Sequence, residues 1–215
     1  PSYADFNGSN HFAKLTGMEN YHVNTNHWSE IAQNLTTFPD GAIAVCRSFD
    51  KTPAGIVGAN GGALCIEHLG NFDLGGDAMT DEQRTSIVKL NAMLCQRYML
   101  TPDASSIIYH HWFAAKSCPG SAFFNGNTID DAQQYFLPLV RQELAVLNAA
   151  MPAKPAVCCG NVTADSLNIR SGPGKDYPKL GALNAGEPVN GYAVENNWWR
   201  IHPTQSRWVY GGYVH

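Results

Sequence analysis

The stretch "CIEHLGNFD", residues 65–73, has the apolar pattern of a strand, with the charged Glu67 inside it. Together with the preceding Ala63 and Leu64 it forms a short apolar run that is interrupted by Glu67. A run of this length is typical of a strand inside a sheet. A carboxylate in the middle of such a strand is costly to bury unless it faces a site. The stretch therefore predicts a central sheet and makes Glu67 a candidate functional residue.

The segments around this strand predict further elements of the same domain. "LTTF" (35–38) and "AIAVC" (42–46) flank the turn residues Pro39, Asp40 and Gly41, which indicates a hairpin. Residues 80–98 predict a helix that begins with a capping box made by Thr80 and Gln83. We expect one face of this helix to carry four apolar or aromatic side chains: Ile87, Leu90, Leu94 and Tyr98.

Two more elements follow before the character of the chain changes. "SSIIYHH" (105–111) predicts a short strand, on which His111 would point away from His110 and serve a structural role. Residues 128–147 predict a helix with Thr128 as its N-cap and a kink at Pro138. The alternation of strands and helices predicts an α/β domain with a mixed central sheet flanked by helices, over residues 1–147.

Composition excludes several classes of partner. The 215 residues are 44% hydrophobic, carry a net charge of −4 and contain no run of Lys or Arg. We therefore expect no nucleic-acid partner, and no apolar run approaches the ~20 residues of a membrane helix. The six cysteines are irregularly spaced, so we expect reduced thiols in a protein made in the cytosol. Of these, we expect Cys46, Cys65 and Cys95 to be small core residues, and Cys158 and Cys159 to be linker thiols.

The segment "YHHWFAAKSCPG" (109–120) brings together residue types that suit hydrolysis. His110 and Cys118 lie eight residues apart and could converge on one ion, since imidazole and thiolate both bind Zn²⁺. Lys116 could stabilise a developing oxyanion, and Glu67 could act as a general base. A catalytic zinc takes three protein ligands, so the pair alone is incomplete.

At this point the sequence resembles the zinc-dependent N-acetylmuramoyl-L-alanine amidases of the phage-lysozyme and peptidoglycan-recognition superfamily. The matching segments are "NYHVNTNHWSEIAQNL", "FPDGAIAVCR", "CIEHLGNFD", "MTDEQ" and "HHWFAAKSCPG". The resemblance implies His110 and Cys118 as zinc ligands, Lys116 as the residue that faces the scissile carbonyl, and Glu67 as the acidic catalytic residue. It implies hydrolysis of the amide between N-acetylmuramic acid and L-alanine in bacterial peptidoglycan.

Two departures from the family pattern stand out. The family's first ligand histidine lies on a strand that precedes every segment seen here, so we expect the third ligand, a histidine, upstream of Pro1. His11, His22 and His27 fall in a later loop and helix and are poor substitutes. Some phage members carry a catalytic tyrosine where this chain has Gln33, and an amide cannot exchange a proton as a phenol does.

The last part of the chain predicts a separate small domain. "NAAMPAKPAVCCG" (148–160) is rich in Ala and Pro, which indicates a linker over residues 148–159. Residues 160–215 show short β-rich runs, typical of a small all-β barrel. "LNIRSGPGKDYP" and "RWVYGGYV" resemble the bacterial SH3-like cell-wall-binding domain, which implies binding to the peptide part of peptidoglycan. The candidate binding residues are aromatic: Trp198, Trp208, Tyr210 and Tyr213.

These expectations describe a modular endolysin or autolysin that acts on the cell wall after release or secretion. Two alternatives stay open. One is a cysteine peptidase that cuts peptidoglycan stem peptides, with Cys118 as nucleophile and His110 as base. The other is a peptidoglycan-binding protein without catalysis.

Overall fold

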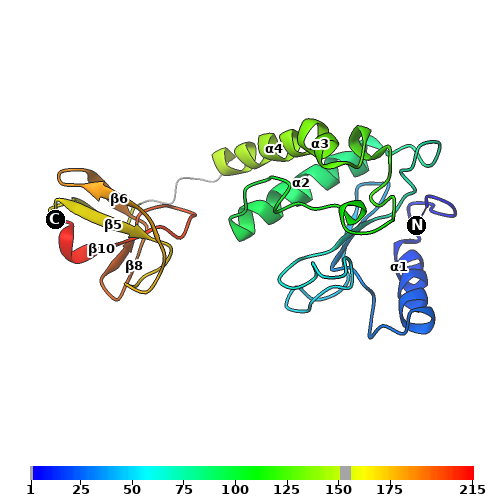
Figure 1. Ribbon diagram of the computed structural model, residues 1–215, viewed down its shortest axis with the longest axis horizontal. Coiled ribbons are helices and arrows are strands. Elements are labelled where there is room, and N and C mark those ends of the chain that lie inside the picture. Colours follow the sequence, from blue (N-terminus) through cyan, green and yellow to red (C-terminus); the bar gives the residue numbers. More distant parts are fainter. Residues whose placement is uncertain (1, 151–155) are drawn as a thin grey trace. The chain divides into compact units, whose positions relative to one another are not determined.

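The computed structural model describes residues 2–150 and 156–215. Contacts within the chain divide it into two compact units, residues 1–148 and 149–215 (Figure 1). The predicted linker lies partly outside the described residues. Within the described residues no helix combines the length and apolar character needed to cross a membrane.

The first unit is built on a small mixed sheet. It contains β1 (Leu35–Thr37), β2 (Ile43–Val45) and β3 (Ile66–His68) in the order β2-β1-β3. β1 and β2 are antiparallel, and the turn between them is closed by hydrogen bonds from Phe38 N–H to the Ala42 carbonyl and from Gly41 N–H to the Phe38 carbonyl, which confirms the hairpin. β3 runs parallel to β1, and Thr36 is the register partner of Glu67.

Helix α2 (Asp81–Tyr98) packs against this sheet. Thr80 caps it by accepting a hydrogen bond from the Gln83 amide N–H. The return bond of the predicted capping box is absent, because the Gln83 side-chain oxygen accepts from the Tyr3 hydroxyl instead. The Gln83 side-chain nitrogen donates to the carbonyls of Thr37 and Leu69. Gln83 thus ties the helix to the sheet. The predicted apolar face holds at Ile87 and Leu90 but fails at Tyr98, which is 42% exposed at the end of the helix.

The predicted helix at 128–147 forms in three pieces, α3 (Ile129–Asp131), the π-helical η4 (Ala132–Phe136) and α4 (Leu137–Ala150). Thr128 and Asp131 form a complete capping box at its start. The π-helical turn lies just before Pro138, whose missing N–H removes one helical hydrogen bond. The irregularity therefore lies where the kink was predicted.

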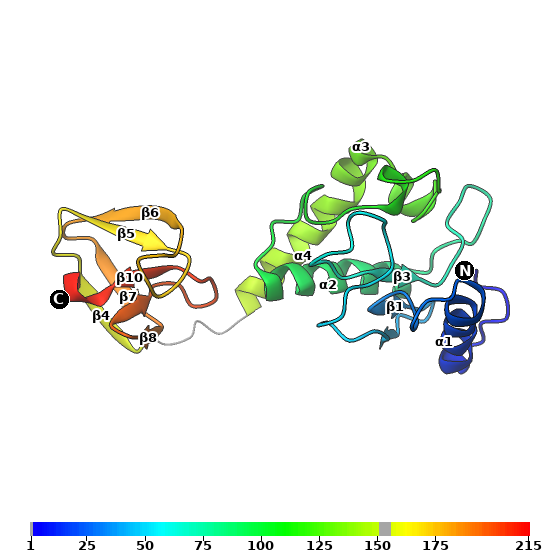
Figure 2. The same cartoon turned by 60° about the horizontal axis from the view of Figure 1, so that its bottom comes forward.

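The core of the first unit is largely aromatic and joins α2 to α4. Phe123, Phe124 and Phe136 are at most 2% exposed, and they pack with Ile87 of α2 and Val140 of α4. In Figure 2 β1 and β3 are drawn between α2 and α1 (His11–Asn20). Helix α1 continues into η1 (Tyr21–Thr25), and neither buries any residue. The mixed sheet with its helices matches the α/β fold that the sequence predicts.

The predicted strand at 105–111 is wrong. Residues 104–106 form a turn, and His110–Trp112 form the 3-10 helix η2, which is followed by the loop to η3 (Phe123–Asn125). Ile107, Tyr109 and Trp112 pack against the aromatic core instead of pairing in the sheet. The apolar residues of this segment are therefore buried against other side chains. Such burial is compatible with a turn as well as with a strand, so the apolar pattern alone did not predict the backbone conformation.

The second unit is all β, as predicted. A five-stranded sheet has the order β6-β5-β10-β9-β8, and a two-stranded sheet joins β4 to β7. Cys158 and Cys159 lie in β4 and are therefore strand residues of this unit. The core includes Leu167, Ile169 and Val209, with Trp199 packed against it. The strands are β4 (Cys158–Asn161), β5 (Ser166–Arg170), β6 (Lys179–Asn184), β7 (Pro188–Gly191), β8 (Ala193–Glu195), β9 (Trp198–Arg200) and β10 (Trp208–Tyr210), followed by η5 (Gly211–Tyr213).

Candidate active site

Glu67 is the middle residue of β3, which is an edge strand of the small sheet. The residue is only partly exposed, and β1 lies directly beside it with the buried Thr36 as register partner. Burial raises the pKa of the Glu67 carboxyl above its usual range. A carboxyl group whose pKa is raised holds a proton more firmly than an ordinary glutamate does.

The segment 110–118 closes on itself through hydrogen bonds made by His111. Its backbone N–H donates to the carbonyl oxygen of Cys118 at 2.8 Å. Its ring Nδ1 lies 2.6 Å from the carbonyl oxygen of Lys116, which places the proton on this nitrogen. His111 therefore holds the loop that carries Lys116 and Cys118. Its expected structural role fits these contacts, although it lies on a 3-10 helix and not on a strand.

A second set of contacts ties this loop to the segment that follows β3. The Asp73 carboxylate accepts hydrogen bonds from the Ser117 hydroxyl at 2.7 Å and from the Ser121 backbone N–H at 2.9 Å. These bonds lower the pKa of Asp73. The Asn127 side chain donates to the Ser117 carbonyl at 2.7 Å. Sequence analysis missed Asp73, Ser117 and Asn127, and no local signal marks them, because the partners of Asp73 lie 44 and 48 residues away.

The two segments also approach each other closely through their backbones. A Cβ atom on Gly120 would lie 2.4 Å from the carbonyl carbon of Phe72, so only glycine fits there. Beside this contact lies a cavity of about 330 Å³, lined by residues 70–73, by residues 117–120 and by Ser2. Cys118, which is exposed, is the candidate site residue in its wall.

Electrostatic interactions relate the four candidate residues to one another. Burial and the charge of Glu67 raise the pKa of the Cys118 thiol. Burial and the charge of Lys116 lower the pKa of the His110 imidazole, which is therefore neutral at physiological pH. The charge of Glu67 thus acts on Cys118 from a strand that is distant in the sequence, whereas Lys116 acts on His110 within one segment.

The donors at this place suit zinc in kind but fall short in number. His110 offers a neutral imidazole and Cys118 a thiol, which are ligand types that zinc prefers. Among the residues that the structure describes, no group of three or more His, Cys, Asp or Glu side chains could hold a metal ion. The described residues therefore do not form a complete zinc site by themselves.

Gln33 lies in the interior of the first unit. Its side chain is 1% exposed, and its amide donates to the Thr36 hydroxyl at 2.9 Å. Thr36 is in turn the register partner of Glu67 on β3.

The aromatic candidates of the second unit divide into two sets. Trp198, Tyr210 and Tyr213 line a common cavity. Trp208 is 8% exposed, is not among the residues that line this cavity, and donates from its indole N–H to the Ser206 hydroxyl at 2.9 Å.

Comparison with known proteins places both units. Residues 6–121 match the model of the N-acetylmuramoyl-L-alanine amidase family, and residues 165–215 match the bacterial SH3 domain. A search of curated protein sequences found no match.

Solved structures resemble the first unit at low identity. The amidase LysC from Clostridium intestinale is 23% identical, and the match covers 62% of this chain and 75% of that one, with a TM-score of 0.46. Drosophila PGRP-LB is 17% identical over 61% of this chain and 73% of that one, with a TM-score of 0.51. The similarity to Drosophila PGRP-LB shows that the two proteins share a fold. The amidase family model matches more than half of the residues of this chain, and the bacterial SH3 model matches its last part. The chain therefore belongs to the N-acetylmuramoyl-L-alanine amidase family and carries a C-terminal bacterial SH3 domain.

Proposed function

We propose that the chain hydrolyses the amide bond between N-acetylmuramic acid and L-alanine in bacterial peptidoglycan, and that the reaction depends on zinc. The family match over residues 6–121 is the observation that carries this proposal. His110 and Cys118 would supply two zinc ligands. Bound zinc would polarise the scissile carbonyl and make a water more acidic.

The chain's own residues take the remaining roles. Glu67, whose pKa is raised by burial, accepts the proton of the attacking water and returns it to the leaving nitrogen of L-alanine. Lys116, exposed on the loop, donates a hydrogen bond to the carbonyl oxygen as negative charge develops there. Hydrogen bonds from Ser117 and Ser121 to Asp73 fix the loop against the end of β3. The reacting groups are therefore held in place before the substrate arrives.

The cysteine-peptidase alternative is disfavoured by the surroundings of Cys118. A nucleophilic cysteine needs a stabilised thiolate, and this requires a lowered pKa. Here burial and the charge of Glu67 raise the pKa of the Cys118 thiol. Cys118 also precedes a proline in a loop and does not begin a helix.

Peptidoglycan binding without hydrolysis is the second candidate function. The observation that favours it is the cavity of about 330 Å³ beside Cys118. A chain that binds no zinc would still present the cavity beside Cys118 to a wall fragment.

The test is hydrolysis of purified walls with identification of the new ends. Amidase action exposes the amino group of L-alanine and the carboxylate of muramic acid, whereas a peptidase exposes other amino groups. Activity should disappear with a chelator and return with Zn²⁺. Cys118→Ser should lower activity by about 100-fold or more, since a ligand is lost. Cys159→Ser, which changes another exposed thiol, should have no effect.

Zinc content separates the two candidate functions. Chelator-resistant lysis or peptidase-type ends would overturn the amidase proposal. A chain that binds walls, contains no zinc after incubation with the metal and releases no ends would be the binding protein.

A further inference from the structure

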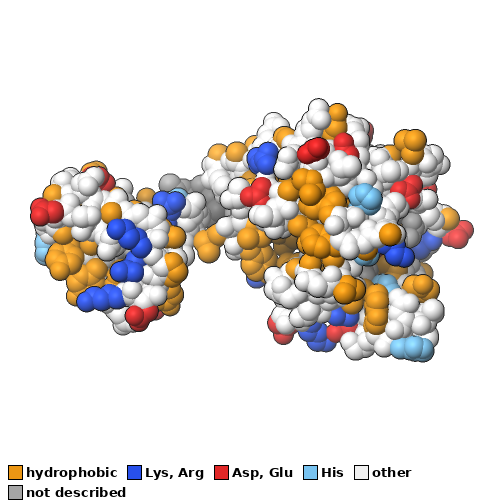
Figure 3. Space-filling model, viewed as in Figure 1, with side chains coloured by type: hydrophobic (Ala, Val, Ile, Leu, Met, Phe, Trp, Pro, Cys, Tyr) orange, Lys and Arg blue, Asp and Glu red, His pale blue; other side chains and the backbone are white. Residues whose placement is uncertain are grey.

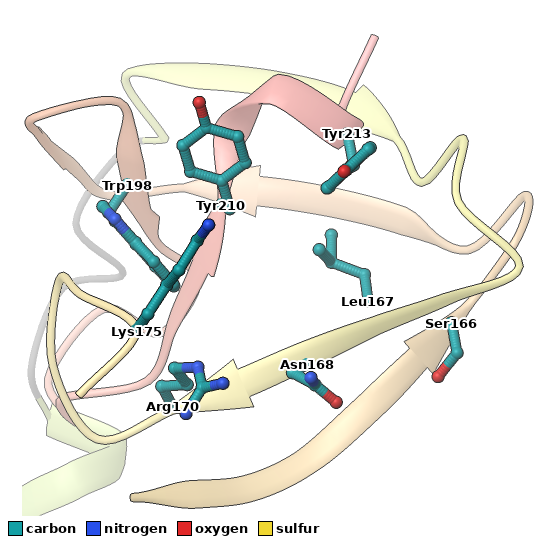
Figure 4. A pocket seen from close by; sticks show the side chains of 8 residues that line it. All are labelled: Ser166, Leu167, Asn168, Arg170, Lys175, Trp198, Tyr210 and Tyr213. Atoms are coloured by element: carbon teal, nitrogen blue, oxygen red, sulfur yellow. The ribbon is translucent and has the colours of Figure 1, made fainter. Parts of the chain in front are cut away.

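The second unit contains a cavity whose lining combines aromatic rings with positive charge. Its volume is about 450 Å³. In Figure 4 three aromatic side chains lie along one side of the cavity, while polar side chains come from β5 on the other. No Asp or Glu is among the described residues that line it. The lining side chains with an aromatic ring, a positive charge or an amide are Asn168, Arg170, Lys175, Trp198, Tyr210 and Tyr213.

The three aromatic residues form a continuous row. The ring centroids of Trp198 and Tyr210 are 5.6 Å apart, and those of Tyr210 and Tyr213 are 5.9 Å apart, both in edge-to-face geometry. Trp198 is 8% exposed and Tyr213 is 51% exposed. The row therefore offers a ligand an apolar surface that begins inside the cavity and reaches the solvent.

The two cations of the cavity have no carboxylate partner. The salt bridges among the described residues all lie in the first unit, so neither Arg170 nor Lys175 takes part in one. On the same sheet, Trp208 is the register partner of both Arg170 and Arg200. The Nε of Arg200 is buried without a hydrogen-bond partner among the described residues. Among the described residues the two cations that line the cavity thus form no salt bridge, which favours an anionic ligand.

The loop that carries Lys175 is held in position by Arg170. The Arg170 guanidinium donates from Nη1 to the Tyr177 carbonyl at 2.7 Å, and Ser171 N–H donates to the Pro178 carbonyl at 3.0 Å. The Tyr177 ring lies against Gly172, where a Cβ would come within 2.3 Å of it. One N–H group of Arg170 thus fixes the loop, and its other N–H groups remain for a ligand.

The charge of the whole unit agrees with this cavity. Residues 149–215 contain six Lys and Arg against four Asp and Glu, whereas residues 1–148 contain eight against fourteen. Figure 3 shows several Lys and Arg side chains on the visible face of the second unit. The second unit therefore has an excess of basic residues, whereas the first unit has an excess of acidic residues.

We propose that this cavity binds the peptide stem of peptidoglycan by a free carboxylate. The carboxylate lies between Arg170 and Lys175, and the aliphatic part of the peptide lies against Trp198, Tyr210 and Tyr213. This inference rests on the proposed function, because it assumes that the second unit binds the same peptidoglycan that the amidase domain would cut. A phosphate of another wall polymer offers similar charge, but it would leave the aromatic row without a partner.

The first experiment measures binding of the full chain to small ligands that it cannot hydrolyse. Calorimetry would compare the tetrapeptide L-Ala-γ-D-Glu-L-Lys-D-Ala with the same peptide amidated at both carboxyls, and with poly(glycerol phosphate). We expect the free acid to bind at least about 10-fold more tightly than the amide, since charge-assisted hydrogen bonds are lost. Equal binding of acid and amide, or binding of the phosphate polymer in place of the peptide, would overturn the proposal.

The second experiment compares three variants with the same loss of charge. Lys175→Met and Arg170→Met should each weaken binding of the acid by about 10-fold and leave binding of the amide unchanged. Arg207→Met removes an exposed cation of the same unit that does not line the cavity, and it should bind as the parent does. Because Arg170 also holds the loop, Lys175→Met decides the outcome. An equal loss for acid and amide in that variant would refute carboxylate recognition.

The result is independent of amidase activity. Binding of the free tetrapeptide without release of wall ends would contradict the proposed function alone. Release of wall ends with no binding of the tetrapeptide would contradict this inference alone.

Discussion

His68 shows how a single side chain on β3 makes stability depend on pH. Its Nδ1 lies 2.9 Å from the Thr37 hydroxyl, and its ring stacks on Phe123 with centroids 5.4 Å apart. Burial lowers the pKa of His68 to about 4. The imidazole is therefore neutral in the folded protein and acts as an aromatic core residue with one hydrogen bond.

We predict that His68 weakens the folded state as the solution is acidified. The unfolded chain protonates it near pH 6.5 and the folded protein only near pH 4, so the unfolded state binds more protons between these values. The contribution of His68 is lost as the pH falls through this window and amounts to at most about 3 kcal/mol. Urea unfolding at pH 7.5 and at pH 4.5 measures it. In His68→Gln the difference in unfolding free energy should shrink, and an unchanged difference would exclude His68 as its source.

At the scale of elements, the site depends on two loops that are joined by one carboxylate. Asp73, which follows β3, accepts from Ser117 and Ser121 of the Cys118 loop. Asp73→Ala should therefore lower the turnover of wall hydrolysis by about 10-fold through misplacement of Lys116 and Cys118, with little change in stability. The readout is turnover compared with the unfolding midpoint.

Asp50→Ala is the matched control for this prediction. The Asp50 carboxylate is also exposed, and its side-chain partner is the nearby Ser48 hydroxyl. This variant should keep full turnover. Full turnover of Asp73→Ala would show that the loop holds its position without the carboxylate.

Elements with local signals could be predicted from the sequence, and elements held by distant contacts could not. The hairpin around Gly41 and the helix capped by Thr128 depend on residues a few positions apart. The segment 105–111 has the composition of a strand, yet Tyr109 packs on Trp112 and Phe123 with ring centroids 4.8 and 5.6 Å apart, and the backbone turns there. Glu67 stands out in the sequence because one charge interrupts an apolar run, whereas Asp73 lies among polar loop residues that look alike in sequence.

At the scale of the whole molecule, the two units differ in charge. The first carries an excess of acidic residues and the second an excess of basic ones. If the second unit attaches the chain to an anionic wall, attachment depends on salt. We predict that raising NaCl from about 0.05 to about 0.5 M weakens sedimentation with purified walls by about 10-fold, because the Debye length shrinks severalfold. Salt-independent sedimentation would show that the aromatic row alone provides the attachment.

The cavity around Arg170 and Lys175 has a consequence for repeated turnover. The carboxylate that it would hold lies on the stem peptide beyond the L-alanine amide, so cleavage leaves that group intact. A cut stem that is still cross-linked to the wall would retain the enzyme beside uncut neighbours. A stem released into solution would instead compete for the cavity, so lysis would slow as its own products accumulate, even while wall substrate remains.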